Sequence, residues 1–508
     1  MRWKLVWQKR PYLPLIGILL LAFGLRLHAL DSQSLWWDEL KTVQRATMTL
    51  PDLLADLTRN RAHLPFYFLL MRGWSLFMGN SAFSVRYFSV LWGVLGVTAV
   101  FQLGKQLATP QVGPSAAFLL AISPFHIWYS QEARMYSFLP TLLILAHVAL
   151  VAVLKKSSKR YWLLYFLAMG TAVFTHYFTF LILLAHAIFA ILNMRLKPQF
   201  ARRWFGQMAV LAALFAPWAY KIASQHGYNE AVPPWINAVH WYEPFLTLWT
   251  FSVGPSLGWK WFPDFVIYAL FLLGFCLGLK HIHNHSRQQN GTSQLLLLWL
   301  GLPLLLILGI SLSGAFSLYV DRYLIIVLPI YLLLVAFGWV SLFGKERIAW
   351  LLGIVALVTA VSLINLVPLY TNPASARNDW RQTFAVINQN SQPTDQIIGI
   401  RDVELPFEFY GLPTLTFLEL PPAEAADVTP AFAQVMTQRI METAVATNRF
   451  WFIEAFYVQD AHNNPTDRNM QVAALPNSAH HQWLQANLAQ KQLWRFPGVR
   501  LTLYERDE

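Results

Sequence analysis

The sequence predicts a polytopic α-helical membrane protein with about 11 transmembrane helices and a C-terminal extracytoplasmic α/β domain. Of its 508 residues, 56% are hydrophobic and only 13% are charged, whereas a soluble protein carries roughly a quarter charged residues. The apolar residues form blocks of about the 18 residues that a spanning helix needs. These blocks stop near Tyr370. We therefore divide the chain into a membrane module, residues 1–370, and a soluble domain, residues 371–508.

The net charge of +12 reflects membrane topology rather than nucleic-acid binding, because Lys and Arg lie in short loops between the apolar blocks. The lone cysteine, Cys276, excludes an intramolecular disulfide. The first apolar block follows a basic leader and has no small-residue cleavage pattern after it, so we expect an uncleaved first span. The predicted spans are Tyr12–Leu30, Ser84–Gly104, Ser115–Trp128, Met135–Leu154, Tyr161–Phe174, Phe178–Met194, Gly206–Tyr220, Trp261–Leu279, Ser293–Leu312, Tyr323–Leu342 and Ile348–Val367.

Two long apolar runs are divided into hairpins. Tyr161–Met194 would be roughly 50 Å long as one helix, well beyond the roughly 30 Å hydrocarbon core. Basic clusters flank both of its ends. If both clusters are cytoplasmic, the run turns back at Thr175-His176-Tyr177. The same reasoning folds Ser115–Leu154 into a hairpin with Gln131-Glu132-Ala133-Arg134 at its tip.

This threading places the N-terminus in the cytoplasm and the C-terminal domain outside. Most acidic residues before Tyr370 then share the outer side, which indicates that the working site is external. They are Asp31, Asp38, Glu39, Asp52, Asp56, Glu132, Glu230, Glu243, Asp264 and Asp321, with Glu346 inside.

Beyond the last span, pattern and composition predict a small α/β domain. We expect helices over Asp379–Asn388 and Thr429–Thr447, and strands over Gln396–Ile400, Arg449–Ala455 and Arg500–Tyr504.

The first external loop, about residues 31–83 with juxtamembrane helices, offers a candidate catalytic base. Asp38 and Glu39 follow two tryptophans, which favour the headgroup level. A carboxylate there is partly desolvated, which raises its pKa and makes it a better base. Alternatively, both are surface acids that open a helix capped by Ser34. Further along, His63 and Tyr67 precede an apolar stretch too short to span, which predicts an interfacial or re-entrant helix; His63 could equally be a solvated polar tip.

Other outer-face residues suit a sugar phosphate. The first hairpin tip carries Glu132, Arg134 and Tyr136; in a helix, Glu132 and Tyr136 would share a face and Arg134 would point elsewhere. His176 and Tyr177 lie at the second tip, and Arg322 and Tyr323 precede the tenth span. Arg322 is the best phosphate ligand, because a guanidinium matches phosphate oxygens and stays charged; the alternative is an arginine snorkelling from a span end. The aromatic loop Ala223–Lys260 could form a lid or an acceptor platform.

Together these motifs resemble the GT-C membrane glycosyltransferases, in particular the bacterial relatives of protein O-mannosyltransferases and of the lipid A aminoarabinose transferase (glycosyltransferase family 39-like). The likeness covers essentially the whole chain. It rests on Leu25-Arg26-Leu27, Leu35-Trp36-Trp37-Asp38-Glu39, a His-x-Pro-x-Tyr element, Ser123-Pro124, Gln131-Glu132-Ala133-Arg134-Met135-Tyr136, Thr175-His176-Tyr177, Asp321-Arg322-Tyr323 and Asp379-Trp380-Arg381. Many relatives have a second proline where this chain has Leu64.

The resemblance implies an inverting transfer of a sugar from a polyprenyl-phosphate donor to a glycolipid, glycan or protein acceptor. Asp38 would deprotonate the acceptor hydroxyl, and Glu39 would support it or help it hold a divalent metal. Arg322, with Arg134 and His63, would neutralise the departing polyprenyl phosphate. No other cofactor is implied.

Two other functions compete with this interpretation. A transporter or flippase of lipid-linked sugars would place its charges near the bilayer midplane and often show paired repeats, which this chain lacks. A polysaccharide polymerase or ligase also consumes lipid-linked sugars, but without an acidic pair after the first span. Nucleotide-binding and zinc-protease motifs are missing from the sequence.

Overall fold

The computed structural model describes residues 13–59, 63–107, 111–156, 158–224, 239–254, 262–285, 291–314, 318–343, 348–371, 378–400, 403–420, 438, 440–442, 449–455 and 479–505. The chain forms two compact units. One consists of Met1–Leu30 and Arg45–Val367, and the other of Asp31–Gln44 and Pro368–Glu508. The start of the first loop, including Asp38, thus belongs to the same unit as the C-terminal region.

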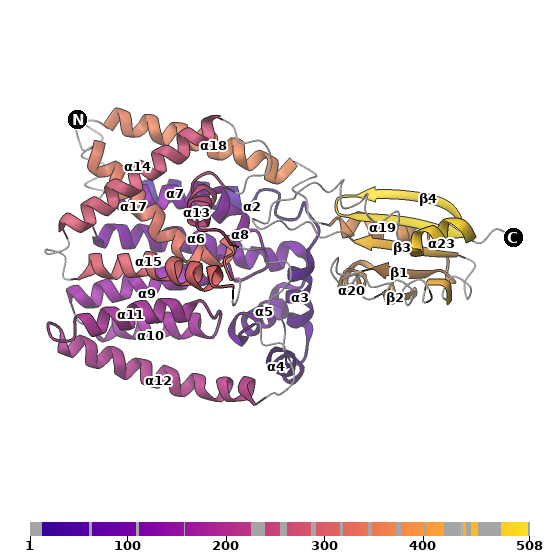
Figure 1. Ribbon diagram of the computed structural model, residues 1–508, viewed down its shortest axis with the longest axis horizontal. Coiled ribbons are helices and arrows are strands. Elements are labelled where there is room, and N and C mark those ends of the chain that lie inside the picture. The colour runs from indigo at the N-terminus through magenta and orange to yellow at the C-terminus, as the bar shows by residue number, and fades with distance from the viewer. Residues whose placement is uncertain are drawn as a thin grey trace. The chain divides into compact units, whose positions relative to one another are not determined.

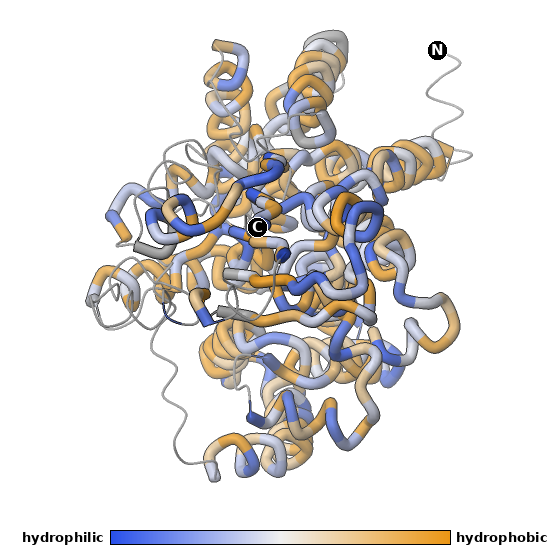
Figure 2. Tube along the Cα trace, turned by 90° about the vertical axis from the view of Figure 1, so that its right-hand side faces the viewer, coloured by the Kyte–Doolittle hydropathy of each residue, from blue (hydrophilic) through white to orange (hydrophobic). Residues whose placement is uncertain are grey.

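The first unit is helical, and Figure 2 shows hydrophobic residues along its helices. Its helices, labelled in Figure 1, are α2 (Leu13–Leu27), α4 (Leu50–Arg59), α5 (Pro65–Met78), α6 (Ala82–Leu107), α7 (Val112–Ile122), α8 (Pro124–Ser130), α9 (Phe138–Lys155), α10 (Lys159–Val173), α11 (Thr179–Leu192), α12 (Pro198–Ala223), α13 (Glu243–Val253), α14 (Phe262–His285), α15 (Thr292–Leu312), α16 (Asp321–Leu324), η1 (Ile325–Val327), α17 (Leu328–Phe343) and most of α18 (Ile348–Thr371). Helix α3 (Trp37–Thr47) is divided between the two units.

The prediction of a helical membrane-type fold is confirmed. Each of the eleven predicted spans coincides with one or more of these helices. Within the part of the chain that the structure describes, five stretches are long and apolar enough to cross a membrane by length and composition: Ala82–Leu107, Phe138–Lys155, Phe262–Asn284, Thr292–Leu312 and Asp321–Leu342. Eleven crossings therefore remain a prediction. In Phe138–Lys155 and Asp321–Leu342, 89% of the most apolar window is buried, which places these two helices at the core of the bundle.

One predicted span is broken in the structure. The expected helix Ser115–Trp128 separates into α7 and α8, because Pro124 lacks an N–H and disfavours helical geometry at Ser123, whose ψ is 115°. The Ser123 hydroxyl then caps α8 by accepting from the backbone N–H of His126. At the end of α7, buried Arg26 of α2 donates to the carbonyls of Leu120 and Ala121 at 2.9 Å each. Arg26 and the Ser123-Pro124 pair thus serve the same structural purpose: they satisfy the backbone groups where α7 ends and α8 begins.

The second unit contains a five-stranded sheet of order β2-β1-β3-β5-β4 (Figure 1). Its strands are β1 (Gln396–Ile400), β2 (Thr416–Leu420), β3 (Arg449–Ala455), β4 (Ala489–Phe496) and β5 (Val499–Glu505), and its helices include α19 (Trp380–Asn390), α20 (Glu404–Tyr410) and α23 (Ala479–Asn487). Strand β1 pairs in parallel with β2 and β3, whereas β5 is antiparallel to β3 and β4. One face buries Ile398, Phe450, Phe452, Leu484 and Tyr504.

The predicted strands Gln396–Ile400 and Arg449–Ala455 are confirmed, as are a helix over Asp379–Asn388 and a strand over Arg500–Tyr504, with small shifts of their ends. Strands β2 and β4 and helices α20 and α23 were not predicted. The expected helix Thr429–Thr447 lies mostly outside the described residues.

Candidate functional site

Asp38 and Glu39 lie in the first turn of α3, where the positive end of the helix dipole favours negative charge. The Glu39 side chain accepts from the backbone N–H of Trp36 at 3.3 Å, the bond by which a glutamate at the third helical position caps its own helix. Glu39 is fully buried, whereas Asp38 is half-buried. Both acids open a helix, as the alternative proposed, but Glu39 is not a surface acid. Ser34 is not the cap; its hydroxyl donates to Asp379 at 3.1 Å.

In the helical unit, Arg134 and His63 contact each other. The Nη2 of Arg134 lies 2.8 Å from Nε2 of His63, so Nε2 accepts and the proton is on Nδ1. That buried Nδ1–H has no hydrogen-bond partner among the residues that the structure describes. His63 also packs edge-on against Phe68, with ring centroids 5.5 Å apart.

A second arginine joins this pair from α3. The Arg45 guanidinium lies 4.6 Å from the Phe68 ring centroid, and that of Arg134 lies 6.0 Å from the same ring. Arg45 is fully buried and forms a 2.7 Å ion pair with Asp56 of α4. Sequence reasoning missed Arg45, because it lies among polar residues of an amphipathic helix and no motif marks it.

Arg322 and Tyr323, at the start of α16, meet the second hairpin tip. The Tyr323 ring lies 5.6 Å from that of His176 and 6.5 Å from that of Tyr136, measured between centroids. The Arg322 guanidinium lies 5.3 Å from the Tyr323 ring, and Arg322 is 5% exposed. The structure thus brings both hairpin tips and the entry to α16 together, as their shared chemistry suggested.

Neighbouring hydroxyls hold the carboxylate beside Arg322. Thr247 of α13 donates to Asp321 at 2.6 Å and lies 3.0 Å from the hydroxyl of Tyr319. These contacts fix the start of α16 and, with it, the backbone that carries Arg322.

The first hairpin tip is a turn and not a helix, so the condition under which Glu132 and Tyr136 would share a helix face is not met. The backbone N–H of Arg134 bonds to the carbonyl of Glu132 at 2.8 Å, a reversal too tight for a helix. This turn directs Arg134 toward Tyr136, whose ring centroid is 6.0 Å from the guanidinium. Glu132 is buried in the same tip.

Two predicted binding residues have less specific surroundings. Tyr67 is fully buried, and its ring packs against Phe68, Phe88 and Phe138, as in a core residue. Tyr177 follows His176 at the second tip, and its backbone carbonyl accepts from Phe180. Of the predicted lid, Ala223–Lys260, the structure describes residues 223–224 and 239–254, which include helix α13.

Both histidines of this region are held neutral. Burial, followed by the charges of Arg134, Arg45, His176 and Arg322, lowers the pKa of His63 well below its usual range. Burial, followed by Arg134 and Arg322, lowers the pKa of His176 to about 4. The Nδ1 of His176 accepts from the backbone N–H of Phe178 at 3.1 Å, which leaves its proton on Nε2.

We call Arg45, Arg134, Arg322, His63 and His176 the basic cluster. It combines buried guanidinium groups with neutral imidazole N–H donors, a set suited to phosphate oxygens. Burial strengthens its attraction for an anion, because the local dielectric constant is lower than that of water. A metal site has less support. Among the residues that the structure describes, no group of three or more His, Cys, Asp and Glu side chains could hold a metal ion. The divalent metal at Asp38 and Glu39 remains a prediction.

Comparisons with known proteins connect this site to a family. Residues 62–220, which include His63, Arg134 and His176 of the basic cluster, match the sequence profile of dolichyl-phosphate-mannose-protein mannosyltransferase. No curated protein matches the chain in sequence.

The fold is that of two solved membrane glycosyltransferases. ArnT from Cupriavidus metallidurans bound to undecaprenyl phosphate superposes with a TM-score of 0.57 at 13% identity, over 96% of this chain and 97% of that one. Its apo state gives a TM-score of 0.57 at 11% identity over the same shares. The Archaeoglobus fulgidus oligosaccharyltransferase in complex with Zn and sulfate gives 0.51 at 12% identity, over 87% of this chain and 68% of that one. The resemblance to GT-C membrane glycosyltransferases is thereby confirmed: the chain has their fold, and its residues 62–220 carry the mannosyltransferase family match.

Proposed function

We propose that this protein is an inverting glycosyltransferase that moves a sugar from a polyprenyl-phosphate donor to a lipid, glycan or protein acceptor on the outer face of a bacterial inner membrane. The observation that carries the proposal is the basic cluster. Its arginines Arg134 and Arg322 are buried, and the charges of both lower the pKa of His176. The ArnT structure of the same fold is bound to undecaprenyl phosphate, which supports a polyprenyl phosphate as the leaving group. The outer-face location rests on the distribution of acidic residues along the sequence.

In the proposed reaction, the Asp38 carboxylate takes the proton of the acceptor hydroxyl. The acceptor oxygen then attacks the anomeric carbon from the face opposite the phosphate, and the bond between that carbon and the phosphate oxygen breaks. The electron pair of this bond leaves with the polyprenyl phosphate, which gains one negative charge. Arg134 and Arg322 stabilise the developing charge, and the neutral imidazoles donate hydrogen bonds to it. The configuration at the anomeric carbon is inverted.

The proposal is tested with purified protein in lipid nanodiscs and a panel of polyprenyl-phosphate sugars. We expect Asp38→Asn to reduce transfer at least about a thousandfold while leaving insertion and folding intact, because the general base is removed. Asp52→Asn is the matched control, since Asp52 lies in the same loop, is exposed and bonds only to Thr49 in the described contacts. Wild-type turnover by Asp38→Asn would refute the assignment. Mass spectrometry of envelope glycolipids and glycoproteins, with and without the protein, would identify the sugar and its acceptor.

A further inference from the structure

The motif Asp379-Trp380-Arg381 at the entry to the C-terminal domain has no part in the reaction proposed above. Its three residues do different things. Asp379 caps α19 by accepting from the backbone N–H of Gln382 at 3.2 Å. Trp380 is fully buried beside Phe384, with ring centroids 6.4 Å apart. Arg381 extends from this fixed position, with its side chain 43% exposed.

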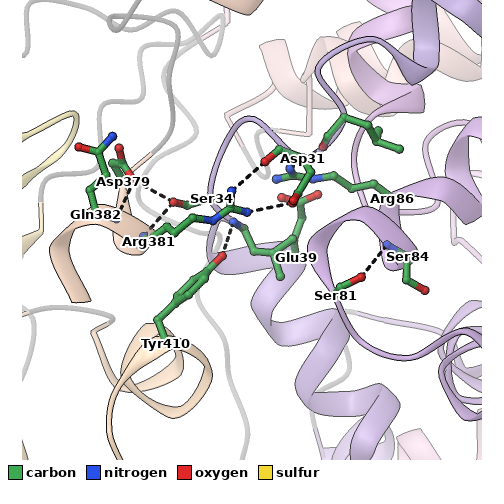
Figure 3. Close-up of polar contacts among 12 residues, drawn as sticks. Asp31, Ser34, Glu39, Ser81, Ser84, Arg86, Asp379, Arg381, Gln382 and Tyr410 are labelled. Atoms are coloured by element: carbon green, nitrogen blue, oxygen red, sulfur yellow. Dashed lines mark hydrogen bonds and ion pairs between the residues drawn. The ribbon is translucent and has the colours of Figure 1, made fainter. Parts of the chain in front are cut away.

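Arg381 and Asp379 hold the beginning of the first loop. The two terminal nitrogens of Arg381 donate to the backbone carbonyl and to the carboxylate of Asp31, each at 2.9 Å (Figure 3). The Ser34 hydroxyl donates to Asp379 at 3.1 Å and accepts from the backbone N–H of Arg381 at 3.0 Å. Ser34 is 4% exposed, so this bond lies in the interior of the unit.

Two further contacts come from α20. The Tyr410 hydroxyl accepts from the backbone N–H of Leu35 at 3.0 Å (Figure 3), and Leu35 is fully buried. At the other end of the segment, the Gln44 amide donates to Glu408 at 3.1 Å. Residues 31–44 are therefore held by the C-terminal domain at both ends, which agrees with their assignment to the same compact unit.

Asp38 lies between these contacts. Ser34 and Leu35 are four and three residues before it. The short segment from Leu35 to Asp38 is held by the hydrogen bond from the Trp36 N–H to the Glu39 side chain. Within α3, the Thr42 hydroxyl donates to the Asp38 carbonyl at 3.0 Å. The backbone of Asp38 thus has little freedom independent of Asp379, Arg381 and Tyr410.

We infer that the C-terminal domain positions the catalytic base: Arg381, Asp379 and Tyr410 hold residues 31–36 and so fix where the Asp38 carboxylate stands. This inference rests on the proposed function, because it needs Asp38 to act as the base. Arg381 is a positioning residue and does not touch the substrate. A base has to lie within hydrogen-bond distance of the proton it takes, and a displacement of about 1 Å can cost roughly a hundredfold in rate. The domain is then part of the catalytic apparatus.

Arg381→Ala tests the inference by steady-state kinetics in nanodiscs. We expect kcat to fall about tenfold and the KM for the polyprenyl-phosphate sugar to stay within about twofold, because the donor-binding residues are untouched. Asp31→Arg/Arg381→Asp reverses the ion pair between two partly exposed side chains but does not restore the bond to the backbone carbonyl of residue 31, so we expect it to recover part of the lost kcat. Arg495→Ala is the matched control, since it removes an exposed arginine from the edge strand β4 of the same domain. We expect it to behave as wild type.

Hydrogen–deuterium exchange supplies a measurement that does not need activity. Arg381→Ala is expected to speed exchange in peptides covering residues 31–36, relative to Arg495→Ala. Faster exchange with unchanged kcat would overturn the positioning role, as would unchanged exchange. A fall in kcat that the reversed pair does not recover even in part would overturn it too. If Asp38→Asn retains full activity, the proposed function fails, whereas the exchange experiment still reports whether the domain holds the segment.

Discussion

Arg134 provides the most direct test of the basic cluster. It is 4% exposed and contacts His63, and its guanidinium faces the rings of Phe68 and Tyr136. A guanidinium forms two parallel hydrogen bonds with a phosphate, each worth about 1.5–3 kcal/mol when a charged group takes part. Arg134→Ala removes both, so transition-state stabilisation falls by about 3–6 kcal/mol. We expect kcat/KM to fall by roughly 10²–10⁴, at about 1.4 kcal/mol per factor of ten.

Arg134→Lys separates charge from geometry. Lysine keeps the positive charge but lacks the planar pair of donors, so we expect a loss of roughly 10–100 fold in kcat/KM, between the wild type and the alanine variant. The assay measures kcat/KM for a polyprenyl-phosphate sugar and the inhibition constant of polyprenyl phosphate, which should weaken in the same order. Arg202→Ala, at an exposed position on α12, is the control. The reasoning would be refuted by an alanine variant that folds and stays within threefold of the wild type in both constants.

Two further predictions concern stability. Burial raises the pKa of Glu454 to about 7 against its partner Arg500, 3.1 Å away. The folded domain binds this proton more tightly than the unfolded chain, so about 3 kcal/mol of stability present below pH 4.5 is lost as the pH rises through 7. We expect Glu454→Gln to make the free energy of unfolding less dependent on pH. Hydrogen exchange in β3 from pH 4.5 to 8 measures this. Arg26→Met leaves the carbonyls of Leu120 and Ala121 without their donor and should cost about 2–5 kcal/mol, seen as a lower unfolding temperature in detergent; an unchanged temperature would contradict it.

The sequence was sufficient to predict the helical membrane fold, because a spanning helix is recognised from a continuous apolar block alone, without knowledge of its tertiary contacts. It was also sufficient for β1 and β3, whose apolar residues are buried on both faces of a sheet. The edge strand β4 was missed. Its sequence, rich in Gln, Lys and Arg, is mostly exposed and lacks any apolar alternation. Its pairing with β5 comes from the tertiary fold.

The basic cluster could be predicted in part. Arg134, His176 and Arg322 stand next to span ends, where charge is costly and therefore informative. Their meeting at one place follows from hairpin topology, which the sequence suggests through the length of its apolar runs. Arg45 does not lie next to a span end. Its helix is amphipathic, and an arginine on the polar face of such a helix does not indicate a binding site. Its burial against Phe68 and its pairing with Asp56 depend on how α3, α4 and α5 pack, which local pattern does not reveal.

The adjacent acids Asp38 and Glu39 illustrate why a motif does not assign roles to its members. The sequence presents them as a pair, yet successive residues on a helix point about 100° apart, so they cannot face one substrate atom equally. Glu39 turns back onto the Trp36 N–H and is fully buried, a position set by helix capping. Asp38 keeps partial exposure, which is why we propose it, and not Glu39, as the base. We therefore interpret the pair as a proposed base, Asp38, and a residue, Glu39, that fixes the helix turn carrying it. Ser34 and Arg381 act in the same way as Glu39, because they hold the segment that leads into this turn.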